Sequence, residues 1–140
     1  MRVIGVDLGS RRIGVAVSDA SGTVASPHLV LARSRDRASD HAALRAVVAD
    51  VGAERVVVGL PLSLDGTMGP AARAVEDEVR ELAAAVAVPV ETVDERLTTV
   101  TAERSLRAGG VRGRRRRAVV DKVAAAVLLQ AWLDARASRP

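Results

Sequence analysis

Stretches of alternating Val, Ile and small residues predict β-strands over the first third of the chain. Residues 1–19 contain two Val- and Ile-rich arms, separated at Gly9 and Ser10, which predicts a β-hairpin. A third strand is predicted over 23–32, where Pro27 indicates an edge strand or a bulge. Because short turns join these three strands, we expect them to be antiparallel neighbours.

Helical spacing of apolar residues predicts helices between the later strands. One helix is expected over 39–51, followed by a buried strand over 55–60 that should lie parallel to the first strand. A second helix, over 70–87, has the pattern of an amphipathic surface helix, and a fifth strand follows over 89–93. The apolar side of the first helix is expected to consist of Ala42, Ala43, Ala46, Val47 and Val51. The solvent side of the second helix is expected to consist of Glu76, Asp77, Glu78, Arg80 and Glu81.

The last third of the chain combines a basic segment with an apolar helix. Thr98 is a suitable N-cap for a helix to Arg107, and residues 109–117 read as a flexible basic loop. The final helix, over 118–137, is apolar around most of its circumference, which predicts burial and places Trp132 in the core. We therefore expect an α/β fold with a mixed five-stranded sheet, three antiparallel strands followed by parallel crossovers, flanked by helices.

Composition limits the possible chemistry. The 140 residues suit one domain, 1–140, and 49% of them are hydrophobic, as in a folded protein. There is no Cys, which excludes zinc–thiolate sites and thiol nucleophiles, and His28 and His41 are expected at the surface or at caps. The net charge of +4 favours a polyanionic partner. The absence of an export signal, of Cys and of a membrane-spanning apolar run predicts a cytoplasmic protein with no membrane partner.

Three acidic residues stand where carboxylates are unusual. Asp7 interrupts a strand that is otherwise apolar on both faces, Glu95 follows the fifth strand, and Asp121 lies in the first turn of the apolar helix. Parallel packing puts the carboxyl ends of the first and fifth strands at one sheet edge, where a packed helix can also deliver Asp121. Converging carboxylates favour hard cations, Mg²⁺ or Mn²⁺, and two such ions suit phosphodiester cleavage. The alternative for Asp7 is a turn-capping role beside Gly9.

Several motifs in a fixed order resemble one family. They are Gly5-Val-Asp-Leu-Gly with Arg12-Ile-Gly-Val-Ala-Val-Ser-Asp, Val58-Gly-Leu-Pro-Leu with Asp65-Gly-Thr, Asp94-Glu-Arg-Leu-Thr, and Asp121-Lys-Val-Ala-Ala with Leu129-Gln and Leu133. Together they resemble the YqgF/RuvX family of ribonuclease H-like nucleases, described as Holliday junction resolvases and as pre-16S rRNA nucleases. The resemblance implies a ribonuclease H-like fold, Asp7, Glu95 and Asp121 as a catalytic and metal-binding triad, and a role in ribosome biogenesis. Ser63 stands where an Asn is expected.

Basic and polar residues near these acids are candidates for contacts with nucleic acid. Phosphate contacts position a nucleic acid without reading its sequence. The candidate set is Arg11, Arg12, Ser63, Thr67, Arg96, Arg114, Arg115, Arg116 and Arg117. For Arg96 the alternative is an ion pair with Asp94, and the sequence does not choose between the two roles. With one aromatic residue the protein has little means of stacking bases, so recognition by shape is expected.

The leading hypothesis is a metal-dependent nuclease that hydrolyses phosphodiester bonds in structured nucleic acid, with 5′-end processing of pre-16S rRNA narrowly preferred over resolution of four-way DNA. Junction resolution needs a symmetric pair of sites, and the chain is expected to be a monomer or a weak homodimer. Two rivals remain open: an ATPase of the actin or sugar-kinase type, suggested by Asp7-Leu-Gly-Ser, and a non-catalytic RNA-binding module.

Overall fold

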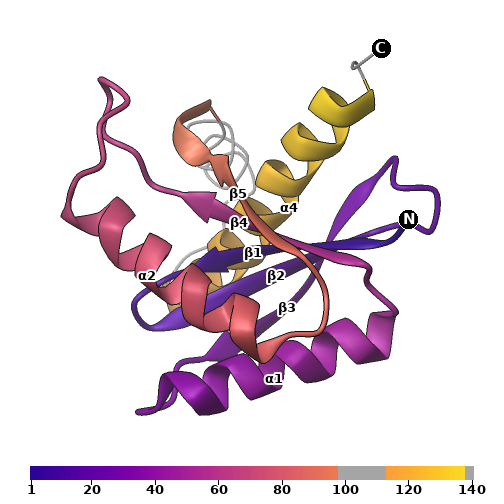
Figure 1. Ribbon diagram of the computed structural model, residues 1–140, viewed down its shortest axis with the longest axis horizontal. Coiled ribbons are helices and arrows are strands. Elements are labelled where there is room, and N and C mark those ends of the chain that lie inside the picture. The colour runs from indigo at the N-terminus through magenta and orange to yellow at the C-terminus, as the bar shows by residue number, and fades with distance from the viewer. Residues whose placement is uncertain (98–112, 138–140) are drawn as a thin grey trace.

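Five strands form one sheet in the computed structural model, in the order β3-β2-β1-β4-β5 (Figure 1). The strands are β1 (Val3–Leu8), β2 (Arg12–Ser18), β3 (Ala25–Ala32), β4 (Arg55–Leu60) and β5 (Val90–Asp94). Strands β1, β2 and β3 pair antiparallel, whereas β4 lies parallel to both β1 and β5. The predicted mixed sheet is confirmed, and the carboxyl ends of β1, β4 and β5 share one edge.

The structure describes residues 1–97 and 113–137, with side chains for 1–96 and 121–137. Its helices are α1 (Arg37–Val51), α2 (Pro70–Ala85), the short 3₁₀ helix η1 (Glu95–Leu97) and α4 (Gly113–Ala137). The helix expected from Thr98 to Arg107 lies outside the described residues. Within the described ranges, no helix has both the length and the apolarity needed to cross a membrane.

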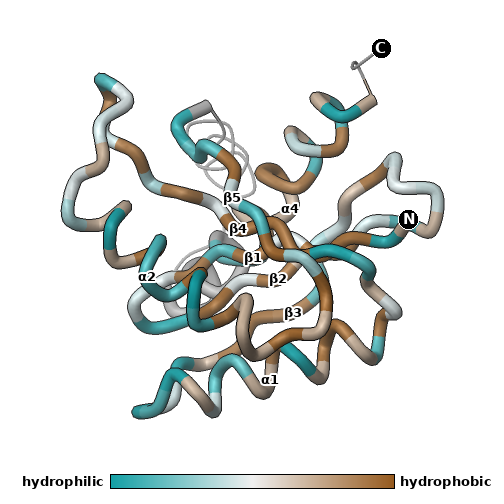
Figure 2. Tube along the Cα trace, viewed as in Figure 1, coloured by the Kyte–Doolittle hydropathy of each residue, from teal (hydrophilic) through white to brown (hydrophobic). Residues whose placement is uncertain are grey.

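The sheet is covered on both faces, because successive side chains of a strand point to opposite sides. On one face Ile4 and Val6 of β1 pack with residues of α1 and α2, such as Leu44 and Leu82. On the other face Val3 packs with residues of α4. Figure 1 shows α1 and α2 together on one side of the sheet, and Figure 2 shows the apolar strands between the layers. This arrangement explains why β1 and β4 are apolar on both faces.

The edge strand behaves as its proline predicts. Strand β3 pairs only with β2 in the described sheet, and the register shifts between Val15 and Ala16, opposite Pro27. Proline cannot donate a hydrogen bond to a neighbouring strand, so it is tolerated at an edge or a bulge. The prediction of an edge strand is confirmed.

Helix α1 differs from its prediction in both its start and its buried side. It begins at Arg37 because the Asp36 carboxylate accepts a hydrogen bond from the Ala38 amide at 3.0 Å and caps the first turn. Ala42 and Ala46, expected on the apolar side, are exposed. Val47, expected on the apolar side, is buried, as are Asp40, His41, Leu44 and Val48, and the expected Val51 packs against the same core. Alanine buries little apolar area, so Leu44 decides which side faces the sheet.

Two predictions for the last helix are corrected. Helix α4 begins at Gly113, so the basic run from Arg114 to Arg117 forms helical backbone and not a loop. Trp132 is only partly buried: its indole N–H donates to the Glu91 carboxylate, and Arg55 and Arg136 lie 6.0 and 5.4 Å from the ring centroid. A polar indole nitrogen needs a partner, which keeps this ring at the boundary of the core.

Candidate active site

Asp7 lies near the carboxyl end of β1, on the face covered by α4. A β-carbon added at Gly5, two residues earlier on the same face, would stand 2.7 Å from Cβ of Leu129 in α4. Burial, followed by the negative charges of Glu95 and Asp121, raises the pKa of Asp7 to about 7. No hydrogen-bond donor or cation of the described residues reaches this carboxyl. Asp7 is therefore a partly buried acid close to two other negative charges, and not the turn cap that the local sequence also allowed.

A glycine brings Asp121 to Asp7. Gly14 is the register partner of Asp7 across the β1–β2 pair. A β-carbon at Gly14 would stand 2.1 Å from the backbone oxygen of Asp121, so α4 lies backbone to backbone on β2 at this point. Only a residue without a side chain permits this approach. The close packing explains how an acid more than a hundred residues away acts on the pKa of Asp7.

Glu95 reaches the same region from the end of β5. It is the first residue of η1, and a β-carbon at Gly59 of β4 would stand 2.8 Å from its Oε2. The Glu95 side chain therefore crosses over β4 toward β1, in space that Gly59 leaves open. Burial, and then the charge of Asp94, raises the pKa of Glu95.

The three acids are brought into electrostatic range, but they are not gathered around one point. Within the described part of the chain, no three His, Cys, Asp or Glu side chains form a group that could hold a metal ion. Asp121 is held by Arg12, whose Nε donates to Oδ2 at 2.6 Å. Arg12, expected to contact phosphate, thus serves in this structure as the counter-charge of Asp121.

The loop after β4 is tied to the segment that carries Glu95. Arg96 donates to both carboxylate oxygens of Asp94 and, through Nη1, to the backbone oxygen of Leu64 at 3.3 Å. The hydrogen bonds from Arg96 lower the pKa of Asp94. Arg96, a candidate for nucleic-acid contact, is therefore occupied in joining two loops.

The other candidate side chains have different surroundings. The Thr67 hydroxyl donates to Asp65 at 2.7 Å, which leaves it only as an acceptor and so a poor partner for phosphate. Ser63 and Arg11 are exposed, and Arg11 has no ion pair among the described side chains. The side chains of Arg114 to Arg117 lie outside the described residues.

A buried ionic network was missed by the sequence analysis. Arg33 donates to both oxygens of Glu78, at 2.6 and 2.8 Å, and His41 Nε2 lies 2.8 Å from Glu78 Oε2. Glu78 and His41 are 4% and 2% exposed, so the predictions of a solvent-facing Glu78 and a surface or capping His41 are wrong. Burial acts to raise the pKa of Glu78, but the hydrogen bonds from Arg33 and His41 outweigh it, and the pKa is lowered.

This network also holds the turn that follows Asp7. Arg33 Nε donates to the backbone oxygen of Gly9 at 2.9 Å, and the Arg33 amide donates to the backbone oxygen of Arg11 at 2.9 Å. No local signal marks Arg33 for this role, because its partners come from the β1–β2 turn, α1 and α2. Arg33 therefore fixes the loop between Asp7 and Arg12 from the opposite face of the sheet.

Comparisons with known proteins agree with this architecture. The sequence profile of the RuvX family, described as Holliday junction resolvase, matches residues 1–135. A protein of Anaeromyxobacter dehalogenans, provisionally named pre-16S rRNA nuclease, is 50% identical over 137 residues, 98% of this chain and 99% of that protein. A protein of Moorella thermoacetica with the same provisional name is 48% identical over 134 residues, 96% of this chain and 95% of that protein.

The solved structure of T. thermophilus RuvC in complex with a Holliday junction substrate has a similar fold. The TM-score is 0.59 at 22% sequence identity, over 99% of this chain and 97% of that chain. The likeness confirms the expected ribonuclease H-like fold. From the match over residues 1–135 and the near-full-length relatives, we conclude that the chain belongs to the RuvX family of nucleases.

Proposed function

We propose that this protein hydrolyses phosphodiester bonds in precursor 16S rRNA, with Asp7, Glu95 and Asp121 as its catalytic acids and a divalent cation as its cofactor. One observation carries the proposal. Asp7 sits at the carboxyl end of the central strand with its pKa raised to about 7, by burial and by the two other acids. Ligands bind preferentially at this edge of an α/β sheet, and perturbed acids gather at functional sites.

The chemistry of the donor set fits a hard cation. Carboxylate oxygens are the ligands that Mg²⁺ and Mn²⁺ prefer, and repulsion among Asp7, Glu95 and Asp121 is relieved by positive charge. When bound, such a cation activates water and stabilises the leaving oxygen of a phosphodiester. Arg12 now supplies the positive charge at Asp121, so binding requires Asp121 to exchange this partner for the cation.

The protein's own residues have separable roles in this proposal. Asp7 and Glu95 would hold the cation from the sheet edge, and Asp121 would be its ligand from α4. Arg12, once released from Asp121, is placed to contact a substrate phosphate, because phosphate and carboxylate suit the same planar guanidinium. Arg11, exposed on the same turn, is a second phosphate contact.

The relatives favour RNA as the substrate. The proteins that are 48–50% identical over almost the whole chain carry the provisional name pre-16S rRNA nuclease. Four-way DNA is the second candidate, and the description of the family profile favours it. The two differ in symmetry, because a four-way junction presents two equivalent strands and is cut by paired sites of a dimer.

Cleavage by matched variants tests the proposal. Labelled pre-16S rRNA and a four-way DNA are incubated with the wild type, Asp7→Asn, Glu95→Gln and Asp121→Asn, in Mg²⁺ or Mn²⁺. Asp50→Asn, which neutralises an exposed acid on α1, is the control. We expect each site variant to lose at least about 100-fold in rate and the control to keep full activity. Equal rates for Asp7→Asn and Asp50→Asn would refute the assignment.

Metal binding is measured separately by calorimetry without substrate. The wild type and Asp50→Asn should bind the cation, and Asp7→Asn should bind it much more weakly. Cleavage of four-way DNA but not of RNA, together with a dimer by sedimentation, would transfer the proposal to junction resolution. If all three site variants lose cleavage but still bind RNA, the three acids serve catalysis, and the alternative of a non-catalytic RNA-binding module is excluded.

A further inference from the structure

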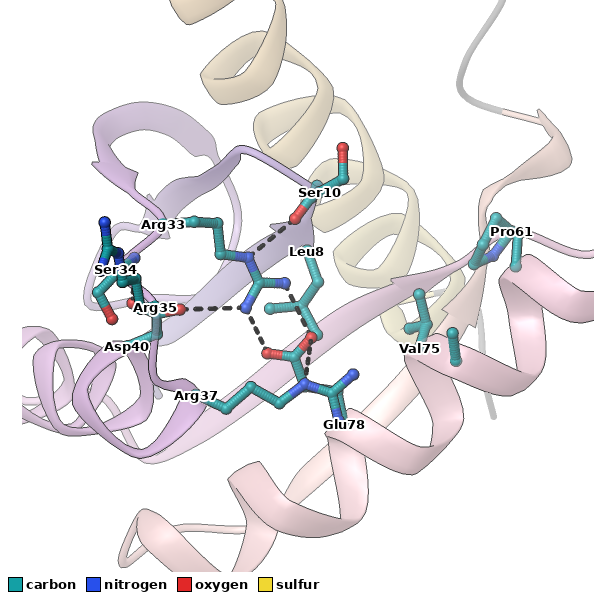
Figure 3. Close-up of a pocket in the computed structure, with 13 residues that line it drawn as sticks. Leu8, Ser10, Arg33, Ser34, Arg35, Arg37, Asp40, Pro61, Val75 and Glu78 are labelled. Atoms are coloured by element: carbon teal, nitrogen blue, oxygen red, sulfur yellow. Dashed lines mark hydrogen bonds and ion pairs between the residues drawn. The ribbon is translucent and has the colours of Figure 1, made fainter.

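A cavity of about 490 Å³ opens beside the β1–β2 turn, on the face of the sheet opposite α4 (Figure 3). It lies between the turn at Gly9 and Ser10, the segment that joins β3 to α1, and the first turns of α2. The volume lies within the range of small-molecule binding sites. None of the residues proposed above to hold the cation lines it.

The walls of the cavity differ in chemistry. One wall is apolar and consists of Leu8, Pro61, Ala71, Ala74 and Val75. The other wall is basic and hydroxylated, with Arg33, Arg35, Arg37, Ser10 and Ser34. A ligand with an uncharged flat part and an anionic part matches this division.

The guanidinium groups are not equally available. Arg33 is committed to Glu78 and Asp40, the acids that line the cavity, and Figure 3 shows it pointing at Glu78. Arg35 is exposed and has no ion pair among the described side chains. Arg37 is 48% exposed; its Nη1 pairs at 3.2 Å with the exposed Glu81, a pair that costs little to break, and its Nε lies 4.0 Å from Oε1 of Glu78. The positive charge available to a ligand therefore belongs first to Arg35, and then to Arg37, whose contacts with Glu81 and Glu78 are longer than those of Arg33.

The cavity is joined to the proposed catalytic edge. Ser10 follows Asp7 by three residues, so the two Cα atoms are at most about 11 Å apart. Arg33, through its bond to Gly9, holds the cavity wall and the turn after Asp7 in one fixed arrangement.

We propose that this cavity binds one nucleotide unit of the substrate, with its phosphate at Arg35 and Arg37 and its base against the apolar wall of α2. The inference rests on the proposed function, which supplies the nucleic acid. The bound unit lies beyond the scissile bond and its base is unpaired, because a paired base cannot enter a cavity of this size. The chain has a single aromatic residue, so an apolar helix face takes the place of a stacking platform.

Two sets of variants test the two walls separately. Arg35→Ala and Arg37→Ala remove the phosphate contacts, with Arg45→Ala, an exposed arginine of α1, as the control of equal charge. Ala74→Leu fills the apolar wall, with Ala83→Leu, at an exposed position of α2 outside the cavity, as the control. All five positions are exposed and helical or loop sites, which tolerate these changes without unfolding.

The first measurement is the affinity of a short single-stranded RNA for these variants in the Asp7→Asn background, without divalent cations. We expect Arg35→Ala and Arg37→Ala each to weaken binding about fivefold and to reduce the salt slope by about 0.7. Ala74→Leu should weaken binding with an unchanged salt slope. Effects no larger than those of Arg45→Ala and Ala83→Leu would overturn the inference, while leaving the catalytic proposal in place.

The second measurement does not depend on nucleic-acid binding or cleavage. Adenosine monophosphate, adenosine and inorganic phosphate are titrated separately, and the backbone amide resonances of Gly9, Ser10 and Ser34 are followed by NMR. The monophosphate should shift these resonances at lower concentration than either part alone, and Ala74→Leu should abolish the difference. Shifts with phosphate alone that equal those with the monophosphate would reduce the site to an anion contact and refute the nucleotide assignment.

Discussion

Replacing Asp7 with Asn should stabilise the metal-free protein, and the gain should depend on pH. In the folded state burial and the charges of Glu95 and Asp121 raise the pKa of Asp7 from 3.8 to about 7. An unfolded chain releases this proton near pH 3.8, so the folded state binds it more tightly. Between these values a rise in pH therefore costs the wild type stability, and it leaves the Asn variant unaffected.

The magnitude follows from the two pKa values. Each pH unit between the two pKa values changes the free energy of unfolding of the wild type by about 1.4 kcal/mol. Above pH 7 the Asn variant should therefore be more stable than the wild type by about 4 kcal/mol. At about pH 5, which lies in the lower part of this pH range, the Asn variant should be more stable than the wild type by about 1.5 kcal/mol. Below pH 3.8 the acid and the amide are both neutral, and the two proteins should be about equally stable.

Urea unfolding in a chelating buffer, at about pH 5 and about pH 8.5, measures this gain. Asp50→Asn is the control and should change the free energy of unfolding by less than about 0.5 kcal/mol at either pH. At the higher pH, free Mg²⁺ at a hundred times its Kd should raise the free energy of unfolding of the wild type by about 2.7 kcal/mol, and that of Asp7→Asn by little. A variant no more stable than the wild type at high pH, or a gain that is the same at both pH values, would refute the account of Asp7.

Two further predictions concern residues that hold the site without belonging to it. Gly14→Ala should lower activity at least about tenfold and destabilise the fold by about 2 kcal/mol, because the added methyl group would stand 2.1 Å from the backbone oxygen of Asp121. Full activity of this variant would show that α4 need not approach β2 this closely. Glu78→Leu should cost about 3 kcal/mol in urea unfolding, because Arg33 and His41 lose their buried partner. The double variant Arg33→Leu/Glu78→Leu should cost less than the sum of the single changes, and strict additivity would argue against coupling.

The strands and their order could be predicted because the signals are local. Alternation along residues 3–8 and 12–18 marks two strands, and the two-sided apolar pattern marks the central one. A helix between strands requires a parallel crossover, which puts β4 beside β1. Asp7 could be singled out for the same reason, since one carboxylate in an apolar strand is visible without any structure.

The buried ionic network could not be predicted in this way. Glu78 lies among charged neighbours on a helix, and His41 stands in an alanine-rich helix with little apolar surface, so local pattern placed both at the surface. Glu78 is buried because Arg33, from a third segment, compensates its charge, and His41 is buried because it pairs with Glu78. A charged side chain is stable inside a protein only with its partner, and the partner is a property of the tertiary structure.

The sequence by itself determined the sheet, its two covered faces and the unusual position of Asp7, because side-chain alternation and connection length act over a few residues. The tertiary structure decided how the acids meet. The backbone of α4 reaches Asp7 only where Gly14 leaves room, and Arg12 then holds Asp121 in place. That arrangement depends on contacts between residues far apart in the chain, which no local pattern of apolar and polar residues encodes.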